Sequence, residues 1–468
     1  MNIIILMLLA PLVALVAELK ISSRHSIAIA SISTFLMLVF SIYLLSVGFI
    51  NKSISISQSI SFIPILNTSF SISVGVIQLV LLLLASIVLF VASFAGNIAE
   101  EKPKLSSALI ILFQFVATGI FTTGNLLIFF IFWDIGVITS FVMLNTLGSQ
   151  ASKRASINFL VYEIFASAML LFAILLIYFY TPLQTFDITS IMFGASAIPI
   201  KVQELVMLFM FIAFMTNMPI FPMHLWMPDA YAEASTQGSM VLAGLLSKFG
   251  VFGMLIMFEI LPIASHYSIY IAALAIFSSV YASFVLAAQR DIKKIVAYAA
   301  MVEMGIILLG ISAANIIGRY GAVYGTLAQG LVIAFLFLVA GSIIHEFGER
   351  DMRMLKGIVA GSKASAYSFV IGTFAIAGMP LTASFIADLL IFIGAYTAFG
   401  FYGLLPLFAI LLMASYFYYV INKSILSSKE KSKNVTYISN AQISGFVLLI
   451  GAILIFGFLP FVILGMVV

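Results

Sequence analysis

Long apolar runs follow one another along nearly the whole chain, separated by short polar segments. A run of about 18 residues or more is long enough to cross about 30 Å of hydrocarbon as an α-helix. Because lipid offers no hydrogen-bond partners, each run must satisfy its backbone groups internally, and helix is the expected structure. Only 8% of the residues are charged, whereas about a quarter of a soluble chain normally is. The sequence therefore predicts an all-α polytopic membrane protein with the lipid bilayer as a partner and no nucleic acid.

The chain contains no cysteine. It therefore forms no disulfide, thiolate metal site or Fe–S cluster of its own, and we expect neither a metal nor a cofactor. Any associated redox centre would lie in partner subunits. The first charged residue is Glu18, so no basic segment precedes the first apolar run, and this run is expected to be a transmembrane helix and not a cleaved signal.

The apolar runs predict fourteen membrane spans. These spans cover residues 2–18, 26–50, 72–97, 105–122, 124–147, 156–180, 202–235, 237–262, 267–287, 291–313, 320–347, 364–397, 400–424 and 440–466. Between the second and third spans, residues 52–71 are rich in serine and isoleucine and alternate them at residues 53–57, which is typical of a short exposed strand or hairpin.

Lysines and arginines fall mostly in the loops that follow odd-numbered spans. Those loops contain Lys20, Arg24, Lys102, Lys104, Lys153, Arg154, Arg290, Lys293, Lys294, Arg350, Arg353, Lys356, Lys363, Lys423, Lys429, Lys431 and Lys433. The loops that follow even-numbered spans contain only Lys52, Lys201 and Arg319. By the positive-inside rule the odd loops face the cytoplasm, so we expect a multi-pass protein of the cell (plasma) membrane with both termini on the outer side.

Two of the predicted spans are unusually long and contain helix breakers. Span 202–235 contains Pro219 and Pro222, and span 364–397 contains Gly378 and Pro380. Proline removes a backbone donor and kinks a helix, so helices 7 and 12 should be discontinuous. Ordinary proline kinks are the alternative, but the breaks fall at matching places in two groups of five spans, which indicates inverted repeats around a transport site.

The repeats predict four units. They are N-terminal helices 1–3 (residues 1–104), a first repeat of helices 4–8 (105–262), a second, inverted repeat of helices 9–13 (263–425), and C-terminal helix 14 (426–468).

Five ionisable residues lie well inside apolar segments: Asp134, Glu163, Lys248, Glu303 and Asp388. Each costs about 2.5–3.5 kcal/mol near the bilayer centre, and such groups usually mark an ion pathway. Together with Gln329 and His345 of span 320–347, they are expected to form an internal polar row. Structural ion pairs are the alternative interpretation. Glu18, Glu204 and Glu259 lie nearer to span ends, where their side chains can extend to the interface.

Four sequence segments carry a resemblance to a known family. Residues 132–134 (FWD) resemble the Trp-Glu motif of the antiporter-like subunits of respiratory complex I. Residues 219–230 (PIFPMHLWMPDA) are similar to that family's Pro-x-x-Pro-x-His-x-Trp-Leu-Pro-Asp-Ala segment, and residues 289–294 (QRDIKK) to its loop before the tenth helix. Residues 335–354, which end in RDMRM, resemble its eleventh helix and the following loop. The similarity covers roughly residues 105–425.

This family includes the proton-pumping M-, N- and L-type subunits, relatives in membrane-bound hydrogenases and large subunits of multisubunit Na⁺/H⁺ antiporters. The resemblance implies two inverted five-helix repeats, two half-channels and a central charged axis. It gives Asp134 the place of the fifth-helix glutamate and Lys248 that of the eighth-helix lysine. Asp388 stands where the family has lysine or, in M-type chains, glutamate, and this acid favours the M-type.

The chain departs from the family pattern at three positions. The seventh-helix lysine is replaced by Asn217, and Glu303 and Gln329 stand where histidines are usual. Asparagine does not titrate, so one expectation is that Lys248 becomes the partner of Asp134 in a shortened proton relay. The other expectation is that the row of acid and amide oxygens suits Na⁺, a hard cation.

The residues around the first break are expected to have structural or gating roles. They are Pro219, His224, Pro228 and Asp229, and Pro380 has the same role in the second break. For His224 two roles are open: a hydrogen-bonded cap of the second half of the broken helix, or a gate.

These observations favour a proton-translocating membrane subunit of a complex I-like NADH:quinone oxidoreductase, driven by electron transport in partner subunits. An Na⁺/H⁺ antiporter subunit or a hydrogenase ion-translocating subunit is the alternative with the same fold. A non-pumping membrane anchor is an alternative of another class, favoured by the loss of the lysine at Asn217. A membrane-embedded lipid enzyme is a weaker alternative, because the four histidines are scattered.

Overall fold

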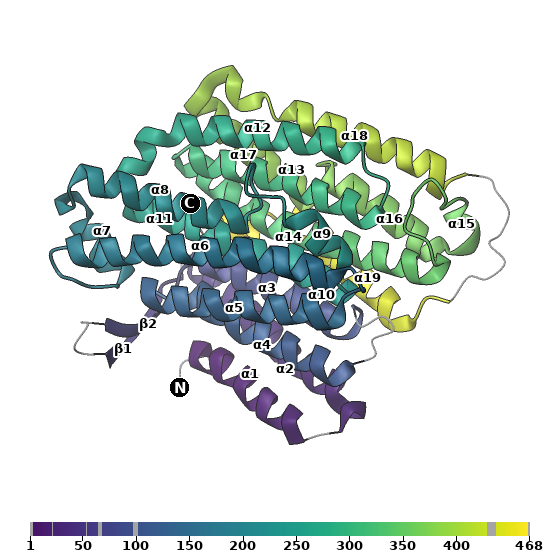
Figure 1. Cartoon of the computed structure of the whole chain (residues 1–468), viewed down its shortest axis with the longest axis horizontal. Coiled ribbons are helices and arrows are strands. Elements are labelled where there is room, and N and C mark those ends of the chain that lie inside the picture. The colour runs from purple at the N-terminus through teal and green to yellow at the C-terminus, as the bar shows by residue number, and fades with distance from the viewer. Residues whose placement is uncertain are drawn as a thin grey trace.

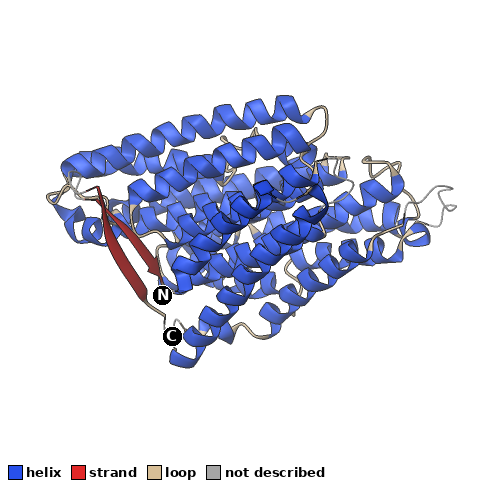
Figure 2. Cartoon of the chain, turned by 90° about the horizontal axis from the view of Figure 1, so that it is seen from below, coloured by secondary structure: helices blue, strands red, loops and turns tan. Residues whose placement is uncertain are grey.

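The structure is a computed structural model that describes residues 3–20, 22–52, 54–63, 68–96, 102–427 and 437–466. Ser53 of the alternating segment and Lys429, Lys431 and Lys433 of the basic loops lie outside the described residues. The helices form one elongated bundle whose members run along its longest axis (Figure 1). Both termini lie at the same end of the bundle, next to the only hairpin that the described residues form (Figures 1 and 2).

The helices of the first part of the chain match the predicted spans closely. They are α1 (Ile3–Lys20), α2 (Ser26–Asn51), α3 (Val76–Phe94), α4 (Pro103–Thr122), α5 (Leu126–Leu147), α6 (Ser152–Tyr180), α7 (Ile188–Gly194), α8 (Ile200–Asn217), α9 (Met227–Glu233), α10 (Thr236–Val241) and α11 (Ser247–Ile260). The short helix α7 is absent from the sequence prediction.

The second part continues in the same way. Its helices are α12 (Ser268–Ala287), α13 (Ile292–Ser312), α14 (Ile316–Phe347), α15 (Ile358–Gly361), α16 (Lys363–Ile376), α17 (Ala383–Phe399), α18 (Leu407–Val420), α19 (Asn440–Phe458) and α20 (Phe461–Leu464). Among the described residues, thirteen helices are long and apolar enough to cross a membrane. The first predicted span corresponds to α1, which lies outside these thirteen, so the count of fourteen and the repeat relationship stay predictions.

Polar side chains fix the starts of several helices. Asn125 accepts hydrogen bonds from the backbone N–H groups of two residues in the first turn of α5, and Asp291 does the same for α13. Asn315 caps α14, and Ser439 forms a capping box with Gln442 at the start of α19. A side-chain oxygen at this position satisfies N–H groups that the helix itself leaves unpaired, so short polar residues between apolar runs set the helix boundaries.

Both predicted helix breaks are confirmed. The first separates α8 from α9 and contains Pro219 and Pro222, while Pro228 lies in the first turn of α9, where its missing N–H costs nothing. The second separates α16 from α17 and contains Pro380. There Gly378 has φ +69°, a left-handed conformation that glycine adopts without steric cost.

A third irregularity interrupts the span predicted as one helix over residues 237–262. Between α10 and α11 the backbone forms a π-helical turn at Leu242–Leu246. π-Turns widen the helix and change the hydrogen-bonding pattern, and they are frequent at functional sites. Lys248 lies two residues after this turn.

The alternating segment is confirmed as a hairpin. Strands β1 (Ile56–Ile63) and β2 (Thr68–Val74) pair antiparallel, from Ile56 opposite Val74 to Ile63 opposite Thr68. The hairpin is fastened to the turn between α4 and α5, because Gly124 N donates to Ser71 O at 2.9 Å and the Asn125 amide donates to Ser69 O at 3.0 Å.

The core of the bundle consists of α11, α13 and α14, whose side chains are almost entirely buried. Helices such as α6, α12 and α18 keep one apolar face exposed. On α6 this face carries Val161, Phe165 and Phe172. An apolar exposed face in a chain of such composition is a lipid-facing surface.

Candidate functional site

The predicted row begins on α5 and α6, which pack against each other. Asp134 on α5 is partly exposed, and its carboxylate accepts a hydrogen bond from the Ser167 hydroxyl on α6 at 2.6 Å. Glu163, one turn earlier on α6, is fully buried and lies close enough to Asp134 for the two charges to interact. Two acids from adjacent helices therefore share one polar region.

Asn217 connects this region to the core. It is the last residue of α8, directly before the first break. Its amide nitrogen lies 3.4 Å from both carboxylate oxygens of Glu163, and its amide oxygen accepts from the Gly250 N–H of α11 at 2.9 Å. A side chain at Gly250 would bring a Cβ within 2.8 Å of Phe214 O, so the close approach of α8 to α11 requires glycine here. Asn217 thus bridges α6 and α11.

Lys248 on α11 is fully buried, and its ammonium is bound within its own helix. Nζ donates to Ala243 O in the π-turn at 2.8 Å and to the Ser247 hydroxyl at 3.1 Å. The expected pairing with Asp134 is wrong: among the described residues no ion pair joins the two. The widened turn offers a carbonyl within reach of the ammonium, while Ser167 satisfies Asp134.

The second half of the row lies on α13 and α17, which pack against each other. Glu303 on α13 and Asp388 on α17 are buried, and their charges are close enough to interact. The Asp388 carboxylate faces the second helix break, since a Cβ built on Gly378 would lie 2.8 Å from Oδ2. The break in α16–α17 therefore brings backbone directly against this acid.

Gln329 and His345 both belong to α14 but lie at different depths. Gln329 is in the middle of the helix, and neither amide atom has a hydrogen-bond partner among the described residues. His345 is in the last turn of α14, 16 residues further on, which corresponds to about 24 Å along the axis. It adjoins Glu346, whose carboxylate accepts from the hydroxyls of Ser362 and Ser365. Only Gln329 lies at the level of the core.

His224 lies inside the first break and contacts aromatic rings. It stacks on Phe221 with centroids 5.7 Å apart and meets the edge of Tyr281 at 5.2 Å. Helix α9 begins after Trp226 and has no side-chain cap bond, so neither ring nitrogen of His224 accepts an N–H group of its first turn. The capping role expected for His224 is therefore wrong, because an N-terminal cap must accept a backbone N–H.

The helices that carry these residues pack in one continuous order. α5 contacts α6, α6 contacts α8, α8 contacts α11, α11 contacts α13, and α13 contacts both α14 and α17. The structure thus places Asp134, Glu163, Asn217, Lys248, Glu303, Gln329 and Asp388 on successively neighbouring helices and leaves His345 at one end of α14.

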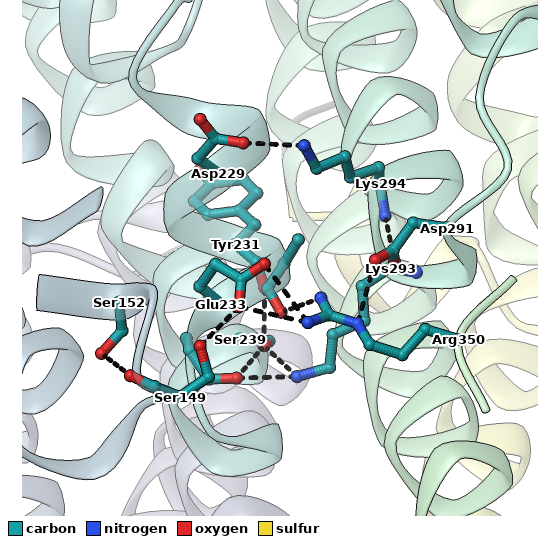
Figure 3. Close-up of polar contacts among 12 residues, drawn as sticks. Ser149, Ser152, Asp229, Tyr231, Glu233, Ser239, Asp291, Lys293, Lys294 and Arg350 are labelled. Atoms are coloured by element: carbon teal, nitrogen blue, oxygen red, sulfur yellow. Dashed lines mark hydrogen bonds and ion pairs between the residues drawn. The ribbon is translucent and has the colours of Figure 1, made fainter. Parts of the chain in front are cut away.

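A second polar group, the α9 ion-pair cluster, consists of Asp229, Glu233, Asp291, Lys294 and Arg350 (Figure 3). Arg350 donates to both carboxylate oxygens of Glu233 at 3.1 and 3.2 Å and to Ala232 O at 2.8 Å. Its Nε lies 2.9 Å from Asp291 Oδ2, and Lys294 pairs with Asp229 at 2.8 Å. The cluster fastens the second half of the broken helix to the start of α13 and to the loop after α14.

Glu233 is the centre of this cluster. Ser149, from the loop between α5 and α6, donates its hydroxyl to Glu233 at 2.5 Å and its N–H to Glu233 O at 3.0 Å. Burial opposes ionisation of Glu233, but the hydroxyl of Ser149 and the charge of Arg350 outweigh it and hold its pKa below the ordinary value. Nearby, Lys293 donates to Ala234 O at 2.7 Å and to the Ser239 hydroxyl at 3.1 Å.

Several polar residues of these sites escaped the sequence analysis. Ser167 and Ser247 are single hydroxyls in apolar runs and give no signal of their own. Tyr231 is fully buried between Trp226 and Phe337, in a segment that the sequence pattern offers no reason to treat as part of the site. Glu18 is 2% exposed, so its expected extension to the interface is wrong within this chain. Ser167 meets Asp134 only because α5 packs against α6, and the spacing of residues along the chain does not reveal this contact.

Sequence comparison places this architecture among known proteins. The family described as NADH:quinone oxidoreductase/Mrp antiporter, TM, matches residues 123–412. NADH-quinone oxidoreductase subunit M of Rickettsia prowazekii is 29% identical over 382 residues, which cover 81% of this chain and 77% of the relative. F(420)H(2) dehydrogenase subunit M of Methanosarcina mazei is 28% identical over 423 residues, covering 88% and 85%.

Solved structures share the fold. A chain of respiratory complex I from Thermus thermophilus superposes with a TM-score of 0.88 at 22% identity, covering 98% of this chain and 96% of that chain. A chain of the Mrp complex from Dietzia sp. reaches 0.87 at 18% identity, covering 100% and 97%. A chain of the membrane-bound sulfane sulfur reductase, an archaeal respiratory membrane complex, reaches 0.86 at 21% identity, covering 99% and 96%.

Proposed function

Because the chain belongs to the NADH:quinone oxidoreductase/Mrp antiporter family, we propose that it is a proton-translocating membrane subunit of a complex I-like oxidoreductase. In this proposal electron transfer occurs in partner subunits, and the chain conducts protons along its buried row. The proposal includes two inverted five-helix repeats, residence in the plasma membrane with both termini outside, and assembly with other membrane subunits.

The observation that carries the proposal is the unbroken order of packed helices that hold ionisable side chains. Glu163, Lys248, Glu303 and Asp388 are all buried. Burying each of these ionisable groups in an apolar bundle costs free energy, and such groups usually mark an ion pathway. A purely structural role would satisfy these groups with one another, yet no ion pair within the described residues involves any of the four. This favours transport over a non-pumping anchor.

Unsatisfied polar atoms support a hydrated path between the charges. One carboxylate oxygen of Glu303 and both amide atoms of Gln329 have no hydrogen-bond partner among the described residues. Buried polar atoms are nearly always hydrogen-bonded, if not to protein then to water. Water at these atoms would connect the fixed groups and allow proton hopping.

In the first half, a proton would pass between Asp134 and Glu163 and reach Lys248 through the α8–α11 contact. Asn217 does not titrate; it holds Glu163 against α11 through its two hydrogen bonds. In the second half, Glu303 and Asp388 would receive the proton, with Gln329 and finally His345 on α14 beyond them. His224, Pro219 and Pro228 at the first break and Pro380 at the second would permit the half-helix movements that open each side. Asp229, paired with Lys294, would anchor the moving half-helix.

Sodium is the second candidate ion, since the row contains acid and amide oxygens, which suit a hard cation. Na⁺ requires several oxygen ligands around one point. Within the described residues no group of three or more histidine and acid side chains is arranged to hold a metal ion. The pairs of acids therefore suit a proton better.

The test is redox-driven acidification by the assembled complex in proteoliposomes, comparing the wild-type chain with Lys248→Met. We expect the variant to lose acidification, because methionine keeps the side-chain volume and removes the titrating group. Lys201→Met, at the exposed start of α8, is the matched control and should pump normally. Wild-type acidification by Lys248→Met would refute the relay. Uptake of ²²Na⁺ that persists with a protonophore would assign the row to sodium.

A further inference from the structure

A cavity of about 650 Å³ lies away from the buried row, at the end of the bundle where the α9 ion-pair cluster is found. It is bounded by the end of α12, the loop that starts α13, the loop after α14 and the end of α18. Four cationic side chains line it: Arg290, Arg353, Lys356 and Lys423. Two tyrosines, Tyr416 and Tyr419, complete the wall, and no carboxylate lines it among the described residues.

The positive charge of this cavity is largely uncompensated. Among the described residues, Arg290, Lys356 and Lys423 form no ion pair. Arg353 has only a long contact, 3.6 Å, with Asp351, and both side chains are largely accessible. Cations that gather around one hollow repel one another unless an anion joins them.

Hydrogen bonds between the walls show that the cavity is preformed. The Tyr416 hydroxyl donates to Gln289 O, which fixes α18 to the end of α12. Met352 N donates to Arg290 O at 2.9 Å, and the Ser424 hydroxyl donates to Met352 O. The segment between α12 and α13, the loop after α14 and the end of α18 are thus fastened to one another. The volume of the cavity is in the range of small-molecule sites.

The surroundings distinguish a lipid from a free anion. An exposed stripe on α18 runs through Phe408, Leu411, Ser415 and Tyr418, at intervals of three or four residues, and Tyr419 lies beside it. Residues at these intervals share one face of a helix. Phe284 of α12 packs beside Phe408, with ring centroids 6.0 Å apart. The cationic hollow therefore lies at the end of an exposed, mainly apolar helix face, with tyrosines at the boundary, as at a membrane interface.

We propose that this cavity binds the phosphate headgroup of an anionic phospholipid, with the acyl chains lying along the exposed face of α18. Arg290, Lys356 and Lys423 bind the phosphate, and Tyr416 and Tyr419 contact the glycerol region. Basic pockets between membrane helices recognise such headgroups through the same chemistry.

The experiment is native mass spectrometry of the purified full chain in detergent, titrated with dioleoylphosphatidylglycerol or dioleoylphosphatidylcholine. The wild type should bind the anionic dioleoylphosphatidylglycerol at least about tenfold more tightly than the zwitterionic dioleoylphosphatidylcholine. Removing one cation should weaken binding about fivefold, and the combined Arg290→Gln, Lys356→Gln and Lys423→Gln variant about a hundredfold. The matched control is Lys102→Gln, Lys153→Gln and Arg154→Gln, which removes the same charge outside the cavity and should leave binding unchanged.

Four results would overturn the proposal. The first is equal affinity for the two lipids, and the second is an equal loss of lipid affinity in the two triple variants at equal melting temperatures. The third is full displacement of the lipid by excess inorganic phosphate. The fourth is that the cavity triple variant loses a partner subunit from the assembled complex while its lipid affinity is unchanged. The third result would assign the cavity to free phosphate, and the fourth to an acidic protein segment. None depends on pumping, so the outcome is independent of the proposed function.

Discussion

Replacing Arg350 by methionine tests whether the α9 ion-pair cluster holds the broken helix in place. Methionine keeps most of the apolar stem, so the change removes the guanidinium with little loss of packing. The wild-type guanidinium donates two bonds to Glu233 and one to Ala232 O, and lies 2.9 Å from Asp291.

The magnitude follows from burial. Breaking a fully buried charge pair costs about 3–5 kcal/mol, and an exposed pair contributes about 0–1 kcal/mol. The Arg350 side chain is 32% exposed and that of Glu233 is 16% exposed. The cluster lies between these limits, so we expect Arg350→Met to lower the free energy of unfolding by about 2 kcal/mol.

The assay is denaturant unfolding of the full chain in detergent, followed by tryptophan fluorescence. Trp226 lies directly before α9, and its indole donates to Thr216 O across the break, so the signal reports on this region. Arg353→Met is the matched control, because its pair with Asp351 is 3.6 Å long and 52% exposed on the arginine side. The control should lose less than about 0.5 kcal/mol.

A double-mutant cycle with Glu233→Gln isolates the pair itself. We expect a coupling free energy of about 1 kcal/mol or more between Arg350 and Glu233. If Arg350→Met loses no more stability than Arg353→Met, or if the coupling is zero, the cluster does not fasten α9 and the reasoning is refuted.

Two further predictions concern the second break and the cluster at low pH. Gly378→Ala should destabilise the chain by about 1–2 kcal/mol, because the φ of Gly378 is positive. It should also slow acidification severalfold, because the added Cβ meets Asp388 Oδ2. The control Gly348→Ala, at φ +67° with no neighbour within 4 Å, should lose similar stability and pump normally. Equal acidification rates of Gly378→Ala and Gly348→Ala would show that the contact between residue 378 and Asp388 does not affect pumping. Because the pKa of Glu233 is lowered in the folded state, its contribution is complete above the ordinary value of 4.5 and is lost as pH falls through the lower folded value. Melting temperatures of the wild type and Glu233→Gln should therefore differ at pH 7 and converge as the pH falls from 4.5 through the lower folded value. A constant difference would exclude Glu233 as the titrating group.

Much of the architecture followed from local sequence alone. The length and apolarity of each run determine a spanning helix, because the bilayer provides no alternative for backbone groups. Pro219, Pro222 and Pro380 broke their helices where the sequence predicted, since proline acts through its own ring. Strands β1 and β2 paired as the predicted hairpin, because alternation is also a local property. The depth of Lys248 or Glu303 in its span could likewise be counted along the chain.

Only the tertiary structure decided which polar groups meet. Asn217 reads as the loss of a lysine, yet it bridges Glu163 and the Gly250 N–H, because α6, α8 and α11 converge there. Lys248 was expected to pair with Asp134 and instead binds the carbonyl of a π-turn that no residue pattern announced. The position of a residue within its span determines its depth in the bilayer. The rotation of each helix about its axis, and the helices that it contacts, are determined by tertiary packing. The partners of a buried charge therefore depend on helices far apart in the chain.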